Sequence, residues 1–205
     1  MLFRRDMNET KEKILLKALQ YFTENDYEGA SLYKIARAIG ITKGGIYHYF
    51  DSKDDLFHEC LVFMFSAIRD ISMAMASSEM TLEEFVNGLF SFEELFNALA
   101  SMFRIDLLDD YFNFAYLMFS GIKKFPDLKI MIGDIYTFMI KELEKVLVGF
   151  QEHGEIDAQL DCNALAFELG SMMEGAMLVA GLDKDFDLKS LGGTMADNVL
   201  RMIRG

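Results

Sequence analysis

A single proline among 205 residues is the feature that most constrains the fold of this chain. Proline breaks helix interiors, so its scarcity favours long helices over many short strands joined by turns. The sequence also lacks alternating runs of β-branched residues bounded by turn residues, the usual signal of strands. A hydrophobic content of 52% is enough to fill a sizeable core. The sequence therefore predicts an all-α fold.

Helix boundaries follow from caps and breakers. Ser52 with Asp55, and Thr81 with Glu84, have the spacing of capping boxes, and Pro126 suits the first turn of a helix. Asp161 and Asp187 are predicted to open helices, and Gly154 to end one. The predicted helices cover residues 8–24, 31–38, 42–50, 52–77, 105–121, 126–152, 161–181 and 187–205, with another beginning at Thr81.

Charge is distributed unevenly along the chain. The net charge is −13, yet residues 1–53 carry nine Lys and Arg against seven Asp and Glu. Residues 54–205 carry eleven against twenty-six. Because local charge decides where an anionic partner binds, phosphate binding is expected only in the N-terminal part.

The first fifty residues have the pattern of a helix-turn-helix. Ser31 is a predicted N-cap, Gly40 suits the tight turn between two short helices, and Thr42 caps the second of them. The second helix of such a motif enters the major groove, where base edges present a readable pattern. Its residues expected to face DNA are Thr42, Lys43, Gly44, Gly45, Tyr47, His48 and Tyr49.

Residues 31–53, SLYKIARAIGITKGGIYHYFDSK, resemble the DNA-binding signature of the TetR family of regulators, and the resemblance extends over about residues 8–60. It implies that Tyr47 and Tyr49 contact phosphate or bases and that Ser31 and Lys53 bind phosphate. By the same resemblance, Thr42 and Lys43 read the groove floor and Phe50 belongs to the core. Gly45 departs from the small polar residue usual at its position, and His48 fits packing as well as base contact.

The predicted organisation is a three-helix DNA-binding domain over residues 1–53 and a helical ligand-binding and dimerisation domain over residues 54–205. The second part is rich in Phe and Met, which suits a deformable apolar pocket as well as an ordinary core. The resemblance places a pocket for a small apolar effector there. Its candidate residues are Met64, Phe65, Ile68, Phe92, Phe96, Phe103, Phe112, Tyr116, Tyr136, Met139 and Glu174.

The last two predicted helices carry small residues beside apolar ones, a pattern that lets another helix approach closely. Pairing them with a second copy about a two-fold axis would cover an apolar patch that two helices alone leave exposed. The alternative is that these faces cover only their own body. The candidate interface residues are Leu165, Leu169, Met172, Ala176, Met195, Val199 and Met202.

Other classes of protein are less well supported. No catalytic triad, phosphate loop or metal-ligand spacing is visible, so we expect no enzyme activity, cofactor or metal. Cys60 and Cys162 are expected to be reduced, buried thiols, and the apolar segment 172–182 is too short for a membrane span, which predicts a cytoplasmic protein. The leading hypothesis is a dimeric, effector-released repressor on a palindromic operator. A helical small-molecule binder without specific DNA binding, or an activator, stays open.

Overall fold

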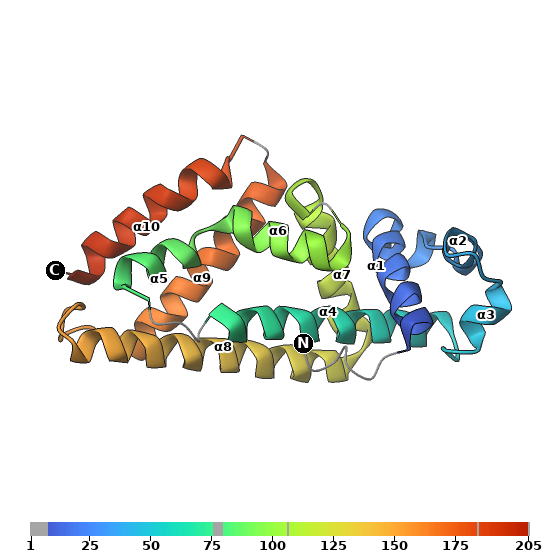
Figure 1. The fold of residues 1–205 in the computed structure, drawn as a ribbon, viewed down its shortest axis with the longest axis horizontal. Coiled ribbons are helices and arrows are strands. Elements are labelled where there is room, and N and C mark those ends of the chain that lie inside the picture. Colours follow the sequence, from blue (N-terminus) through green and yellow to red (C-terminus); the bar gives the residue numbers. More distant parts are fainter. Residues whose placement is uncertain (1–7, 76–79, 106, 184, 205) are drawn as a thin grey trace. The chain divides into compact units, whose positions relative to one another are not determined.

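A computed structural model describes residues 8–75, 80–105, 107–183 and 185–204. All regular structure in these residues is α-helical, which confirms the predicted fold class (Figure 1). The helices are α1 (Glu9–Gly29), α2 (Leu32–Ala38), α3 (Lys43–Tyr47), α4 (Lys53–Met75), α5 (Leu82–Leu89), α6 (Phe92–Phe103), α7 (Leu107–Lys124), α8 (Pro126–Glu152), α9 (Cys162–Leu182) and α10 (Leu188–Arg204).

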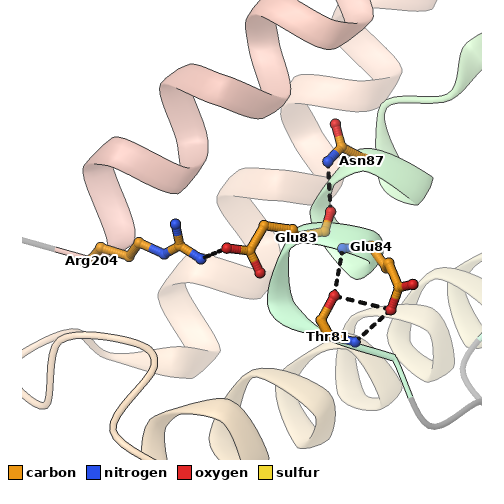
Figure 2. A network of polar contacts seen from close by, with 5 residues as sticks. All are labelled: Thr81, Glu83, Glu84, Asn87 and Arg204. Atoms are coloured by element: carbon orange, nitrogen blue, oxygen red, sulfur yellow. Dashed lines mark hydrogen bonds and ion pairs between the residues drawn. The ribbon is translucent and has the colours of Figure 1, made fainter.

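Most helix ends carry the caps that the sequence predicts. Thr81 Oγ1 accepts the Glu84 amide at 3.2 Å and the Glu84 carboxylate accepts the Thr81 amide at 2.9 Å, which confirms that capping box (Figure 2). Pro126 is the first residue of α8, and the Asp161 carboxylate accepts two amides of α9. These caps satisfy amides that have no partner inside their own helix.

Several boundary predictions differ from the structure, among them the ends of α3 and α7, which were predicted over 42–50 and 105–121. Residues from Thr81 onward form two helices, since the chain breaks between α5 and α6. Helix α1 runs to Gly29, but Asp26 has a φ of +54°, so the regular part ends near the predicted end. The Ser52 hydroxyl accepts the Asp55 amide at 3.0 Å, as predicted, but the Asp55 carboxylate accepts the amide of Asp51 instead of that of Ser52. Among the described residues, the Ser31 hydroxyl caps no amide of α2. The predicted end at Ser77 lies outside the described residues.

The chain divides into two compact units. Unit 1 comprises Met1–Ile71 and Leu99–Gly133, and unit 2 comprises Ser72–Ala98 and Asp134–Gly205. The N-terminal helices thus share a unit with α7, which sequence reasoning assigned to the second domain. A functional boundary after Lys53 stays a prediction.

Unit 1 is organised around an aromatic core between α1 and α4. Phe22 and Phe57 are buried, with ring centroids 4.8 Å apart in an edge-to-face arrangement. Burial of each such side chain contributes about 1.5–3 kcal/mol. The Gln20 side-chain amide adds a hydrogen bond of 2.5 Å to the carbonyl of Arg104, which precedes α7.

Unit 2 is held by α10 lying against α5. Arg204 pairs with Glu83 at one end of this contact (Figure 2). Lys189 lies 2.9 Å from the Glu93 carboxylate on the following helix. Gly192 is buried, and a Cβ added there would lie 2.3 Å from the carbonyl oxygen of Phe90. The close approach of α10 therefore requires glycine at this position.

Helix α9 is apolar on two opposite faces. One face is buried and holds Cys162, Leu165, Ala166 and Leu169. The opposite face is exposed and holds a line of small and apolar residues. This α9 stripe consists of Ala164, Phe167, Ser171, Gly175, Leu178 and Leu182.

Helix α9 is apolar on both faces, and by length and composition it could cross a membrane. Of an 18-residue stretch of this helix, 22% is buried. The prediction that this region is too short for a span considered only its second half and is wrong on length. A core helix of a protein outside the membrane meets the same criterion.

We expect Gly192→Ala to lower the free energy of unfolding by about 1–3 kcal/mol, because the new methyl group meets backbone that must move. Gly193→Ala is the matched control, since nothing lies within 4 Å of its added Cβ. The control is expected to be neutral or to stabilise by up to about 1 kcal/mol through helix propensity. Urea unfolding at fixed protein concentration measures both, and equal stability of the two variants would contradict the close approach.

Candidate nucleic-acid interface

Helices α2 and α3 form the helix-turn-helix, and Gly40 makes the turn between them. Gly40 has a φ of +76°, a left-handed conformation that side chains rarely adopt. Its amide donates to the carbonyl of Arg37, and the Ile41 amide donates to that of Ala36 at 3.0 Å. This pair of bonds closes the end of α2 and redirects the chain into α3.

Helix α3 is short and is stabilised at its start by Thr42. The Thr42 hydroxyl accepts the Gly45 amide at 3.1 Å, as the N-cap prediction requires. Ile46 and Phe50 are buried beneath the helix, which confirms Phe50 as core. One face of α3 is thus anchored and the other is left for a partner.

The residues predicted to bind DNA fall into two groups. Thr42, Lys43, Gly44, Tyr47 and His48 are exposed. Ser31, Gly45, Tyr49 and Lys53 are half-buried. His48 also meets the Tyr49 ring edge-to-face at 5.2 Å, so the structure supports a packing contact for His48 as well as exposure.

Lys53 has partners inside the protein. Its Nζ donates to the carbonyl of Glu28 at 3.3 Å and lies 4.6 Å from the centroid of the Tyr27 ring. The Tyr27 hydroxyl donates to Asp54, and this bond, followed by the neighbouring Lys124, lowers the pKa of the Asp54 carboxyl. Burial, followed by the bond to Asp54, raises the pKa of Tyr27. Lys53 therefore sits in an ordered cluster.

Helix α2 presents three further candidates that sequence reasoning did not select. Tyr33, Lys34 and Arg37 are exposed, and Tyr33 is 61% exposed. They occupy the face of α2 opposite the buried Leu32 and Ile35. Helical periodicity could have found them, because Leu32 and Ile35 mark the buried face of α2 and leave these three residues on the other.

The predicted effector residues are divided between the two units. Six of them lie in unit 1 and five in unit 2. Phe112 and Tyr116 are 45% and 56% exposed, unlike the pocket lining that was expected. Within unit 2, the Tyr136 hydroxyl donates a hydrogen bond of 2.9 Å to the Glu174 carboxylate. The buried members are Met64, Phe65, Phe92, Phe96 and Phe103.

The predicted interface residues are similarly mixed. Leu165, Leu169 and Val199 are buried inside unit 2, so they support the surface instead of forming it. Met172 is 37% and Met202 is 50% exposed. Ala176 and Met195 are half-buried. The exposed α9 stripe is the part of this region that helical spacing in the sequence could have separated from the buried face.

Comparison with known proteins agrees with this geometry. Residues 14–60 match the model of bacterial regulatory proteins of the tetR family. The negative transcriptional regulator IcaR of the icaADBC biofilm operon of Staphylococcus aureus is 30% identical over 83 residues. That alignment covers 40% of this chain and 45% of IcaR, so the chain spans under half of this relative.

Two solved structures share the fold over nearly the whole chain. FadR of Bacillus subtilis, in complex with stearoyl-CoA, has a TM-score of 0.67 and 20% identity, covering 92% of this chain and 96% of FadR. The TetR family regulator PfmR of Thermus thermophilus has a TM-score of 0.65 and 21% identity, covering 92% and 97%. Residues 14–60 therefore form a helix-turn-helix domain of the tetR family of bacterial regulatory proteins.

Proposed function

We propose that this protein is a transcriptional repressor that binds a palindromic operator as a homodimer and leaves it when a small apolar effector binds. The observation that carries the proposal is the exposed face of α3, built from Thr42, Lys43, Gly44 and Tyr47 over a buried Ile46. Hydroxyls, a cation and bare backbone are groups that contact phosphates and base edges. IcaR is a negative transcriptional regulator, which favours repression over activation.

The acidic remainder of the chain supports binding through the N-terminal helices alone. Residues 54–205 have a strong excess of carboxylates, which phosphates repel. One short recognition helix reads too few bases for useful specificity, so two copies on a two-fold-related site are expected.

The α9 stripe supports a dimer. It places Phe167 at 65% and Leu182 at 63% exposure on one line of the helix, with small residues between them. On α10, Leu191, Met195 and Met202 recur at helical spacing and are at least partly exposed. A second copy would cover both apolar lines, and small residues would let the helices approach closely.

The effector proposal rests on the buried aromatic and methionine side chains and on the acyl-CoA ligand of FadR. Helix α4 begins at Lys53, within the predicted DNA-binding surface, and carries Met64, Phe65 and Ile68 further along. A ligand that contacts these residues and prefers the conformation that does not bind DNA would weaken operator binding.

Removing the two candidate cations separates affinity from specificity. The probe is a duplex selected from a random pool by the wild-type protein, with a scrambled duplex beside it. Lys53→Met is expected to weaken both equally and to reduce the slope of log K against log salt by about 0.9, as one lost phosphate contact does. Lys43→Met is expected to reduce discrimination between the duplexes by about tenfold. Lys141→Met, an exposed charge on α8, serves as the control, and an unchanged slope for Lys53→Met would refute its phosphate role.

Glycine at position 44 has no structural requirement inside the protein. The φ of Gly44 is not left-handed, and its added Cβ would lie 3.7 Å from Thr42 Oγ1, an ordinary contact. Gly44→Ala is therefore expected to raise stability by up to about 1 kcal/mol. It should nevertheless weaken binding to the selected duplex, because the methyl group faces the groove. Unchanged affinity in a fluorescence anisotropy titration would show that the DNA backbone and bases stay clear of Gly44.

A charge in the α9 stripe tests the dimer. Leu178→Glu is expected to give a folded monomer with much weaker operator binding, since Leu178 is 41% exposed in the single chain. Ile130→Glu, at a 68% exposed position on α8, is the matched control and should stay dimeric. Sedimentation velocity at micromolar concentration distinguishes them. A monomeric wild-type protein, or a dimeric Leu178→Glu variant, contradicts this interface.

A further inference from the structure

The segment that joins α7 to α8 contacts the DNA-binding helices within unit 1. Lys124, the last residue of α7, places its Nζ 3.0 Å from the Asp54 carboxylate on the first turn of α4. The same Nζ lies 4.3 Å from the centroid of the Tyr27 ring near the end of α1. The Tyr27 hydroxyl donates to Asp54 as well. The Lys124 ammonium group therefore contacts both α1 and α4.

A second polar contact lies one helical turn further along α4. His58 Nε2 is 2.6 Å from the carboxylate of Asp127, in the first turn of α8. The ring of Phe125 meets His58 edge-to-face at 5.1 Å. Asp54 and His58 are four residues apart and share a face of α4. The segment that joins α7 to α8 therefore contacts two successive turns of α4.

A third contact continues the same face. A Cβ added at Gly121 would lie 2.1 Å from Leu61 Cδ1, so α7 approaches α4 very closely there. Leu61 is fully buried and lies seven residues after Asp54. The end of α7 and the start of α8 therefore contact the first three turns of α4, through packing as well as through charge.

Tyr27 and Asp54 lie next to the segments that connect the α2–α3 pair to the rest of the chain, so their contacts bear on DNA binding. Only two connections join the α2–α3 pair to the rest of the chain, one before Leu32 and one after Tyr47. Tyr27 lies at the start of the first connection, and Lys53 and Asp54 at the end of the second. Lys53 and Lys124 both lie against the Tyr27 ring, at 4.6 and 4.3 Å.

We propose that Lys124, which lies outside the matched DNA-binding domain, is a positioning residue that holds both connections to the α2–α3 pair in the arrangement required for DNA binding. This inference rests on the proposed function. The clamp formed by Tyr27, Asp54 and Lys124 is partly exposed, and exposed ion pairs and cation–π contacts are individually weak. Its loss leaves the unit folded and loosens the helix pair, which lowers the fraction of molecules competent to bind.

The first measurement needs no DNA. Deuterium uptake of the free protein is followed in peptides from the end of α1 and the start of α4. Lys124→Met, which keeps the length of the side chain and removes its charge, is expected to speed uptake there at least threefold. Lys124→Arg is expected to restore the wild-type rate, because a guanidinium group also pairs with a carboxylate and stacks on an aromatic ring. Lys123→Met is the matched control, being exposed and adjacent.

The second measurement uses the duplex selected by the wild-type protein. Lys124→Met is expected to weaken binding about threefold to tenfold with an unchanged salt slope, because no phosphate contact is lost. Lys124→Arg and Lys123→Met should stay within about twofold of wild type. Asp54→Asn should repeat the loss, and the double variant Asp54→Asn with Lys124→Met should be no worse than either alone, as for residues that act as one unit.

The outcomes separate the two proposals. If the wild-type protein selects no duplex, the proposed function fails, and the uptake measurement still decides whether Lys124 holds the end of α1 and the start of α4. If uptake in Lys124→Met equals that in Lys123→Met, the clamp is overturned. A salt slope lowered by about 0.9 in Lys124→Met would also overturn it, since Lys124 would then touch phosphate itself.

Discussion

The packing of α1 on α4 is the interaction on which the rest of the DNA-binding unit depends. Phe22 and Phe57 meet at its centre, and Tyr27 lies 5.0 Å from the Phe57 ring at the edge. Lys11 and Glu59 add an ion pair of 3.2 Å along the same contact. Because α4 starts six residues after α3 ends, fixing α4 on α1 also fixes where the recognition helix can lie.

Helix α3 has one side packed against the protein and one side exposed to solvent. The side of α3 that faces the protein is closed by Ile46 and Phe50, and its free side is polar. In unit 2, by contrast, the exposed face of α9 is apolar, as its buried face is. Apolar surface without a covering partner is costly in water, so the two units suit two partners, a polyanion for one and a second copy for the other.

Local signals were predictable from the sequence and long-range contacts were not. The turn at Gly40, the capping box of Thr81 and Glu84, and the start of α8 at Pro126 depend on neighbours within a few residues. The break between α5 and α6 was missed although Ser91 and Glu94 have the spacing of a capping box, because neither Phe90 nor Ser91 is a glycine or proline. Exposure on α3 followed from helical periodicity around Ile46, which is why most predicted DNA contacts are accessible.

The cluster around Tyr27 shows where sequence reasoning stops. It joins residues 27, 53, 54 and 124, and no spacing in the sequence relates position 124 to the other three. The predicted effector residues stay a prediction for the same reason. A Phe or Met at helical spacing fits a core and a pocket equally well, and only the tertiary contacts decide between them.

The central claim is that α3 lies in the major groove in two copies related by a two-fold axis. His48→Cys places a thiol on the exposed end of α3, and the two native cysteines are buried, so an iron–EDTA group can be attached at position 48 alone. On the selected duplex, we expect two clusters of strand cleavage, symmetric about the centre and about 10 base pairs, or a multiple of one helical turn, apart. Uniform cleavage along the duplex, or none while the labelled protein stays bound, would contradict the account.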